Sequence, residues 1–535
     1  MKAEGETMAA LVESAAGVFG DRVAIEDGET ILSFAQLAAA GRRAARAFIA
    51  TGLEPGDRVA IWAPNLHEWI VAAIGLQSAG AVLVTLNTRL KGAEAGYVLA
   101  KSGARVLCTV ADFLGTNYLE LLRGALGGEH PERPVSELPQ LENLVLLRGE
   151  SDGALGWSRF LDSADEVSED RAARRAAALS PEDPSDILFT SGTTGKPKGV
   201  VTCHGQNLRA FEAWSELVGL REGDRYLIVN PFFHAFGYKA GWLSCVMRGA
   251  TILPHQVFDV PAVLERVARE RVSVLPGPPA LYQSILAHPD RTNHDLSCLR
   301  LAVTGAAAIP VELIHRMRSD LGFETVITGY GLTEACGIAT MCRHDDDPET
   351  IATTSGRAIP EVEVVCVDRS GQEVARGEAG EVVIRGYNVM RGYFDDEQAT
   401  AEAIDDEGWL HSGDVGVMDE RGYLRITDRI KDMFIMGGFN CYPAEIESLM
   451  LANRELAQVA VIGVPDERMG EVGMAFVLPV PGASPSVESI VAWCRENMAN
   501  YKVPRYVELV EELPMNAAGK VMKYLLRERA GKRRA

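Results

Sequence analysis

The sequence predicts an α/β protein with a large N-terminal domain and a small α+β C-terminal domain. Three observations support this prediction. The chain has 535 residues, which is more than one hydrophobic core normally accommodates. Its first four-fifths alternates short apolar runs with helical patterns, whereas the last hundred residues follow a different pattern. Its composition, 47% hydrophobic and 24% charged, is typical of an ordinary globular protein.

Strands and helices alternate through the large domain. The first expected strands are 58–63, 81–87 and 105–110, with helices at about 65–79 and 92–102 between them. A second series of strands, again separated by helices, is expected at 226–230, 250–253, 272–275, 299–305 and 324–329. Strand–helix–strand alternation favours parallel pairing, so we expect two parallel-rich sheets with helices covering both faces.

The pattern changes after about residue 360. VEVVCVDRSGQEVARGEAGEVVIRG has turn residues between β-rich runs and no helix, which predicts a small antiparallel, barrel-like section. Further on, YPAEIESLMLAN predicts a helix, and ELAQVAVIGVPDERMGEVGMAFVLP predicts two strands around an acidic turn. We therefore expect a large domain over 1–428, a short connection at 429–431 and a small domain over 432–535.

Charge and cysteine content exclude several classes of protein. The formal net charge is −21, so the chain as a whole would repel nucleic acid and anionic membranes. Nine cysteines without zinc or redox spacing, and an acidic N-terminus, indicate reduced thiols in a soluble cytoplasmic protein. The uncharged stretch 69–86 approaches the length of a membrane span. Its polar centre favours instead a helix that ends at Gly80, followed by a buried strand.

The stretch ILFTSGTTGKPKGVV (187–201) has the pattern of a strand that runs into a phosphate-binding loop. Gly192 and Gly195 leave backbone N–H groups free to bind phosphate oxygens. The other candidate phosphate ligands are Thr190, Ser191, Thr193, Thr194, Lys196 and Lys198. The P-loop motif is excluded, because only two residues separate the glycines and Pro197 replaces a magnesium-binding hydroxyl. A nucleophilic role for Ser191 is disfavoured, because no G-x-S-x-G elbow surrounds it.

This stretch resembles the signature of the adenylate-forming superfamily, which includes acyl-CoA synthetases, adenylation domains of peptide synthetases and beetle luciferase. Further stretches resembling its signatures follow in order: GYGLTEA (329–335), GWLHSGDVG (408–416), TDRIKDMFIMGGFN (427–440) and LPMNAAGK (513–520). The resemblance therefore spans nearly the whole chain. It implies that the small C-terminal domain is mobile and rotates about a hinge.

The resemblance implies a nucleotide site assembled from several motifs. Tyr330, between Gly329 and Gly331, would stack on the adenine of ATP. Thr333 would contact phosphate, and Glu334 would bind Mg²⁺ beside the triphosphate, as carboxylates do. The remaining implied positions are Gly305, Ala306 and Ala307 beside the adenine, Asp414 at the ribose, Arg429 at ribose or phosphate, and Lys431 at the hinge.

The resemblance also implies the catalytic order. Lys520 would bridge the carboxylate of the acid and the α-phosphate of ATP during adenylation. The small domain would then rotate, and Gly437 and Gly438 would line a channel for the pantetheine arm of CoA.

The acyl pocket is expected beside NPFFHAFGYKAG (230–241). By resemblance, His234 is a gate next to the carboxylate, and a hydrogen-bonded core histidine is an equal alternative. Gly237 and Tyr238 are expected to line the cavity. Lys239 either points to solvent or meets a polar group at the far end of a substrate.

We therefore expect an ATP-dependent carboxylic acid:CoA ligase that uses Mg²⁺ and acts on a fatty, alicyclic or steroid-derived acid. The sequence around the expected acyl pocket resembles most closely that of bacterial fatty-acid synthetases of the FadD type. One alternative is a stand-alone adenylation enzyme that loads a carrier protein. Another is an inactive nucleotide-binding homologue, which is disfavoured because the motif residues are all present. No nucleic-acid or integral membrane partner is expected, and a homodimer remains open.

Overall fold

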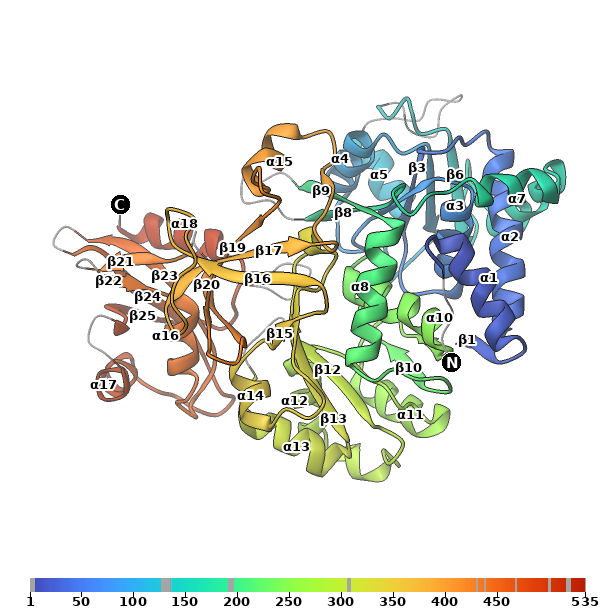
Figure 1. Ribbon diagram of the computed structural model, residues 1–535. Coiled ribbons are helices and arrows are strands. Elements are labelled where there is room, and N and C mark those ends of the chain that lie inside the picture. The colour runs from blue at the N-terminus through green and yellow to red at the C-terminus, as the bar shows by residue number, and fades with distance from the viewer. Residues whose placement is uncertain are drawn as a thin grey trace. The chain divides into compact units, whose positions relative to one another are not determined.

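The computed structural model describes residues 5–126, 135, 137–190, 197–305, 309–429, 432–436, 439–466, 469–498, 502–515 and 521–534. The chain divides into two compact units. Unit 1 comprises Met1–Val364 and Ile384–Leu410, and unit 2 comprises Val365–Val383 and His411–Ala535. The large and the small domain of the prediction are therefore present, while the boundary at 428–432 stays a prediction. Figure 1 shows the elements of both units.

The larger sheet of unit 1 has eight strands in the order β18-β9-β8-β4-β3-β5-β6-β7. The strands from β8 through β7 pair in parallel, whereas β9 and β18 pair antiparallel at one edge. Their bounds are β3 (Arg58–Trp62), β4 (Val82–Thr85), β5 (Val106–Val110), β6 (Asn143–Arg148), β7 (Leu155–Gly156), β8 (Pro184–Thr190), β9 (Lys198–Cys203) and β18 (Gly392–Tyr393). The parallel alternation predicted from the sequence is confirmed.

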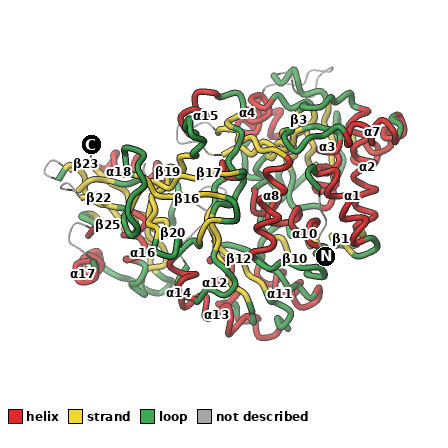
Figure 2. The backbone as a smooth tube through the Cα atoms, viewed as in Figure 1, coloured by secondary structure: helices red, strands yellow, loops and turns green. Residues whose placement is uncertain are grey.

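The helical segments that precede β8 in the chain are coloured red in Figure 2. They are α1 (Met8–Phe19), α2 (Phe34–Ala50), α3 (His67–Ser78), α4 (Gly92–Ser102), α5 (Tyr118–Leu126), α6 (Trp157–Asp162), η1 (Ser163–Glu166) and α7 (Glu169–Ala177). Every residue of α3 after His67 is buried. A helix buried on all sides needs a mostly apolar sequence, which explains the long uncharged stretch. Gly80, at φ 85°, turns the chain from α3 into β4, as expected.

The remaining strands of unit 1 form two four-stranded sheets, β10-β11-β1-β2 and β12-β13-β14-β15. Their bounds are β1 (Val23–Asp27), β2 (Thr30–Ser33), β10 (Arg225–Ile228), β11 (Thr251–Pro254), β12 (Leu301–Gly305), β13 (Thr325–Tyr330), β14 (Thr340–Met341) and β15 (Arg357–Ala358). Val274 bridges Tyr226 and Leu301 in parallel. The strand expected at 272–275 is therefore reduced to an isolated bridge, which joins the two sheets.

Helical segments lie between and after these strands. They are α8 (His204–Leu217), α9 (Ala235–Gly237), the π-helical turn η2 (Tyr238–Leu243), α10 (Ser244–Arg248), α11 (Val260–Glu270), α12 (Pro279–Ala287), η3 (Pro289–Asn293), α13 (Val311–Leu321), η4 (Thr333–Ala335), α14 (Pro348–Thr353) and α15 (Glu397–Ala403). Within the described ranges, no helix is both long and apolar enough to span a bilayer.

Unit 2 contains a five-stranded sheet in which β22-β21-β24-β23 lie in order and β25 pairs with β24. Its elements are β21 (Phe434–Met436), β22 (Phe439–Cys441), α16 (Pro443–Met450), β23 (Leu456–Asp466), β24 (Gly470–Pro479), α17 (Val487–Asn497), β25 (Tyr506–Leu509) and α18 (Lys523–Arg534). Apolar clusters that include Val461 and Ile462 pack on the sheet. The expected α+β domain is confirmed.

A further sheet has the order β16-β17-β19-β20. Its strands are β16 (Val362–Val367), β17 (Ala379–Gly386), β19 (Leu410–Met418) and β20 (Leu424–Arg429), of which β19 and β20 pair antiparallel. Turns rather than helices connect β16 to β17, in agreement with the change of pattern in the sequence after residue 360.

Candidate functional site

Strands β8 and β9 flank the phosphate-binding motif. They pair antiparallel, with Thr190 opposite Lys198, and the Thr190 hydroxyl donates to the Lys198 carbonyl over 3.5 Å. A P-loop connects a strand to a helix, so this strand-to-strand connection is a second argument against that motif. The candidate residues between these strands, Ser191, Gly192, Thr193, Thr194, Gly195 and Lys196, lie outside the described residues.

The carboxyl ends of β12 and β13 carry the candidate adenine residues. Gly305 and Gly329 lie opposite each other in parallel register, and Tyr330 is the last residue of β13. A Cβ atom on Gly329 would lie 2.8 Å from the Thr340 carbonyl oxygen, so the backbone leaves no room for a side chain there. Ala306 and Ala307 lie outside the described residues.

The segment after β13 folds tightly on itself. A Cβ atom on Gly331 would lie only 2.2 Å from the Gly337 carbonyl oxygen. Cys336 adopts a left-handed conformation at φ 56°, which ends the short 3₁₀ turn η4. Thr333 and Glu334 belong to that turn, so their positions are set by a compact loop.

Glu334 has a partner that the sequence motifs did not reveal. The Tyr393 hydroxyl donates to the Oε1 atom of Glu334 over 2.9 Å. The Lys198 ammonium lies 4.8 Å from the centroid of the same Tyr393 ring. Burial, followed by the Glu334 charge and hydrogen bond, raises the pKa of Tyr393, so its phenol stays protonated and donates. Tyr393 therefore contacts residues of two separate motifs.

The surroundings of Glu334 fit the Mg²⁺ role that the family resemblance implies. Mg²⁺ takes oxygen ligands, commonly one or two carboxylates together with phosphate oxygens. Glu334 is half-buried and offers a carboxylate whose Oε1 atom is held by a neutral hydroxyl. Within the described ranges no cation forms an ion pair with Glu334, so its negative charge is available to a metal ion.

His234 is exposed, so the alternative of a core histidine is wrong. Its Nδ1 atom accepts a hydrogen bond from the Phe236 backbone N–H over 3.2 Å and caps the short helix α9. The gate role is compatible with this exposure and stays a prediction. A Cβ atom on Gly237 would lie 2.2 Å from the Pro231 carbonyl oxygen, so this glycine packs against backbone rather than an open cavity.

Lys239 is buried, so the alternative in which it points to solvent is wrong. Its side chain is 1% exposed and its Nζ atom lies 3.0 Å from Asp186, which is fully buried. Lys239 also donates to the Asn207 side-chain oxygen over 2.7 Å and to the Thr202 hydroxyl over 3.0 Å. The charge is therefore neutralised inside the protein, and no far end of a substrate is needed to explain it.

Tyr238 belongs to the core beside Lys239. Its ring stacks on Trp242 with centroids 4.9 Å apart, and its hydroxyl accepts from Gln77 over 3.0 Å. Tyr238 is 1% exposed. Trp69 completes a buried aromatic cluster with these two rings. Tyr238 is thus part of a buried aromatic cluster, and its role as a cavity-lining residue stays a prediction.

The candidate ribose residue, Asp414, lies in unit 2. Asp414 lies on β19 opposite Arg429 on β20, and is 4% exposed. The backbone N–H of Asp414 donates to the Ser412 hydroxyl over 3.1 Å. Only the backbone of Arg429 is described, so its side-chain role stays a prediction. The other candidates in this part of the chain, Lys431, Gly437, Gly438 and Lys520, lie outside the described residues.

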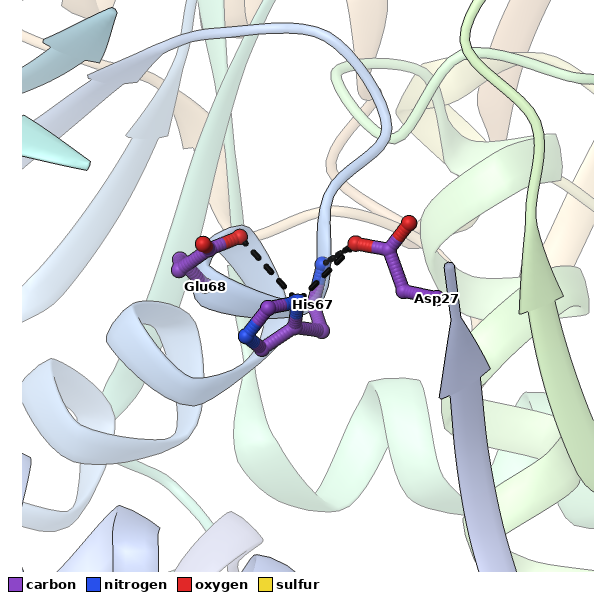
Figure 3. Close-up of side chains that lie close together, drawn as sticks. All are labelled: Asp27, His67 and Glu68. Atoms are coloured by element: carbon purple, nitrogen blue, oxygen red, sulfur yellow. Dashed lines mark hydrogen bonds and ion pairs between the residues drawn. The ribbon is translucent and has the colours of Figure 1, made fainter. Parts of the chain in front are cut away.

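Asp27, His67 and Glu68 form a second cluster of polar side chains (Figure 3). The Nδ1 atom of His67 lies 2.9 Å from Asp27 and 3.2 Å from Glu68. Arg148 donates to both carboxylates, and its Nε atom lies 2.9 Å from Glu68. Because a guanidinium already neutralises these oxygens, the cluster is better suited to joining β1, α3 and β6 than to holding a metal ion.

The electrostatics of Asp27 agree with this structural role. Burial alone would raise the pKa of Asp27, but hydrogen bonds from His67 and the charge of Arg148 lower it to about 2. The carboxylate therefore stays ionised at neutral pH.

Comparison with known proteins agrees with the motifs. The model of the AMP-binding enzyme family matches residues 12–394, and that of the AMP-binding enzyme C-terminal domain matches residues 445–520. A methyl-dioxo-octahydroindenyl-propanoyl:CoA ligase from Rhodococcus jostii is 48% identical over 530 residues, covering 99% of both chains. A ligase with the same name from Mycobacterium tuberculosis is 50% identical over 485 residues, covering 91% of both chains.

Solved structures share the fold. The ATP-bound MatB from Rhodopseudomonas palustris superposes with a TM-score of 0.84 at 28% identity, covering 97% of this chain and 98% of that one. The chain therefore belongs to the family of AMP-binding enzymes. Within that family it is an acyl-CoA ligase of the AMP-forming kind.

Proposed function

We propose that this enzyme adenylates a hydrophobic carboxylic acid bearing a fused-ring substituent and transfers the acyl group to CoA. One structural observation supports the adenylation step in particular. Tyr393 contacts both Lys198 of the phosphate motif and Glu334 of the expected metal motif, so these two motifs meet at one place. Such a meeting is what a site for a triphosphate with its metal ion requires.

The proposed reaction overcomes the low reactivity of a carboxylate toward nucleophiles. A carboxylate resists nucleophiles because it is negatively charged and because oxide is a poor leaving group. Attack of a carboxylate oxygen on the α-phosphorus of ATP forms acyl-AMP and releases pyrophosphate, and the thiol of CoA then displaces AMP. Because two anions must meet in the first step, catalysis depends on positioning and charge stabilisation rather than on acid–base groups.

Residues of several motifs perform this first step in the proposal. Lys520 binds the carboxylate and the α-phosphate together, while Lys198 holds the outer phosphates. Glu334 holds Mg²⁺, whose charge, when it is bound, stabilises the departing pyrophosphate. Asp414 accepts hydrogen bonds from the ribose hydroxyls, as acidic residues do in dinucleotide sites.

The nature of the acid is inferred from the relatives. The two ligases reported above act on a propanoyl group that carries a methyl-dioxo-octahydroindenyl ring system, by their names. In this chain Tyr238, in the expected pocket segment, and Trp242, directly after that segment, form a buried aromatic cluster with Trp69. The fused-ring acid is therefore proposed from the relatives, and the buried cluster supplies packing for this part of the chain.

A carrier protein is the alternative acceptor, because both acceptors present a pantetheine thiol. The expected channel glycines, Gly437 and Gly438, suit either. The relatives favour CoA, since both ligases are named for it.

An AMP-release assay over a panel of acids, with and without CoA, tests the proposal. The panel should contain an octahydroindene propanoate, a medium-chain fatty acid and a benzoate. We expect AMP and thioester to form in equal amounts only with CoA present, and fastest with the fused-ring acid. AMP without thioester would indicate another acceptor, and no AMP with any acid would contradict the proposal.

We also propose a cytoplasmic location. All nine cysteines are free thiols and eight of them are buried, which agrees with a reducing compartment. Cell fractionation with an antibody against the chain tests this location, and recovery from a membrane or secreted fraction would contradict it.

A further inference from the structure

Tyr393 is fixed against the strand that carries Lys198. Strand β18 pairs with β9, with Tyr393 opposite Val200. The Phe394 N–H donates to the Gly199 carbonyl over 2.7 Å, and the Tyr393 N–H donates to the Thr400 hydroxyl over 2.8 Å. Strand pairing and hydrogen bonds to the backbone therefore fix the position of Tyr393 independently of its side chain.

Gly392 explains how the chain reaches this position. It has φ 145°, a conformation that side chains disfavour, and a Cβ atom there would lie 2.8 Å from the Thr400 methyl carbon. The chain thus needs glycine directly before Tyr393.

The segment that leads into β18 also holds the loop of Glu334. The Met390 N–H donates to the Glu334 carbonyl over 2.8 Å, and the Asn388 amide donates to the Ile338 carbonyl over 2.7 Å. Asn388 is fully buried. Backbone and side-chain bonds from one segment therefore hold the loop at Glu334 and again at Ile338.

The Tyr393 side chain lies between two opposite charges. Its hydroxyl donates to Glu334, and its ring lies beside the Lys198 ammonium. Lys198 and Glu334 both lie in described parts of the chain, and no ion pair joins them. A direct ion pair would cancel the negative charge that a metal ion needs and the positive charge that a phosphate needs.

We propose that Tyr393 is a positioning residue for adenylation, which keeps the Glu334 carboxylate directed to the metal ion of ATP and keeps Lys198 free for phosphate. This inference rests on the proposed function. The hydroxyl fixes the carboxylate by a hydrogen bond without neutralising it, and the aromatic ring attracts the ammonium without withdrawing its N–H donors. Tyr393 touches no reacting atom in this proposal and acts through its two neighbours.

Tyr393→Phe separates the two contacts, because it retains the ring and removes only the hydroxyl. We expect it to raise the Mg²⁺ concentration needed for half-maximal ATP binding by about threefold to tenfold, which corresponds to the net contribution of a typical intramolecular hydrogen bond. The measurement is calorimetric titration of the full chain with a non-hydrolysable ATP analogue at several Mg²⁺ concentrations. Thermal stability should stay near that of the wild type.

Two further variants make the test specific. In a Glu334→Gln background, Tyr393→Phe should have little further effect on the Mg²⁺ requirement, because the positioned charge is already absent. Tyr118→Phe is the matched control: its hydroxyl donates to the Thr88 carbonyl over 2.9 Å, outside the motifs. This control should leave the Mg²⁺ requirement unchanged.

The outcomes separate this inference from the proposed function. If Glu334→Gln shifts the Mg²⁺ requirement but Tyr393→Phe does not, Tyr393 has no positioning role and the inference is overturned. A uniform loss of ATP affinity at every Mg²⁺ concentration would also overturn it. Failure of every acid to release AMP would contradict the proposed function, while the calorimetric result for Tyr393 would still be readable.

Discussion

Gly305 and Gly329 lie directly opposite each other at the carboxyl ends of the neighbouring parallel strands β12 and β13. A Cβ atom on Gly305 would lie 3.3 Å from the Gly329 carbonyl oxygen, and one on Gly329 would lie 2.8 Å from the Thr340 carbonyl oxygen. Two motifs that are separate in the sequence therefore form one edge without side chains. Such an edge allows a flat group to approach the backbone closely.

Alanine substitutions at this edge should have graded effects. We expect Gly329→Ala to lower the free energy of unfolding by about 1–3 kcal/mol, because rigid backbone opposes the new methyl group. Gly305→Ala should cost less stability, since its contact needs only a small adjustment, and should instead raise the KM for ATP. Thermal melting and ATP–pyrophosphate exchange measure the two effects.

The control for these substitutions is Gly124→Ala, on α5. A Cβ atom there meets nothing within 4 Å, so we expect no loss of stability. Equal melting temperatures for all three variants would contradict the account of the glycine edge.

Asp27 should make stability depend on acid pH. Its folded-state pKa of about 2 lies below the ordinary 3.8, so its contribution is present above pH 4 and is lost as pH falls toward 2. Asp27→Asn should therefore lower the free energy of unfolding at pH 7 by about 2 kcal/mol, and the difference should shrink in acid. Urea unfolding at pH 7, 4 and 2 measures this difference.

Asp152→Asn provides a comparison, because Asp152 is exposed and its contact to Arg123 uses the backbone carbonyl. We expect no measurable change for it at any pH. A pH-independent cost for Asp27→Asn would show that packing rather than charge explains the cluster.

Lys239 and Asp186 should depend on each other. Lys239→Met removes one member of a fully buried ion pair and should cost about 3–5 kcal/mol of stability, because the Asp186 charge is left without its cation. Adding Asp186→Asn to that variant should restore part of the loss. Denaturant unfolding of the single and double variants tests this coupling.

Lys101→Met serves as the exposed counterpart. Its ammonium lies 3.4 Å from Asp395, whose side chain is 80% exposed, so we expect a cost below about 1 kcal/mol. Equal costs at both lysines would contradict the buried-pair account.

Lys520→Ala should separate the two half-reactions. We expect ATP–pyrophosphate exchange to fall by at least about a hundredfold, because the bridge between carboxylate and α-phosphate is lost. Thioester formation from presynthesised acyl-AMP and CoA should be largely retained. Equal loss of both reactions would remove this role for Lys520.

Much of the fold was predictable because parallel strands are buried on both faces. VLVT of β4 is buried at every residue, and such runs are easily recognised. The strand expected at 272–275 was wrong in extent, since only Val274 bridges its neighbours. An apolar run indicates burial, but pairing depends on neighbouring strands that no local pattern specifies.

The site was predictable where a motif fixes residue order, and less so where contacts are made through space. Lys239 was misread because its partner, Asp186, lies far away in the sequence and charged residues are usually exposed. Tyr393 was missed for the same reason, although the glycine before it and its place after a β-rich section were visible signals. His234 was ambiguous because exposure cannot be read from its apolar neighbours.

In the proposed reaction a carboxylate oxygen of the acid attacks the α-phosphorus of ATP. The most direct test is a single turnover with an octahydroindene propanoic acid labelled with ¹⁸O in both carboxyl oxygens, followed by mass spectrometry of the products. We expect AMP to gain one ¹⁸O atom and pyrophosphate to gain none. Label in inorganic phosphate with release of ADP, or unlabelled AMP, would contradict it.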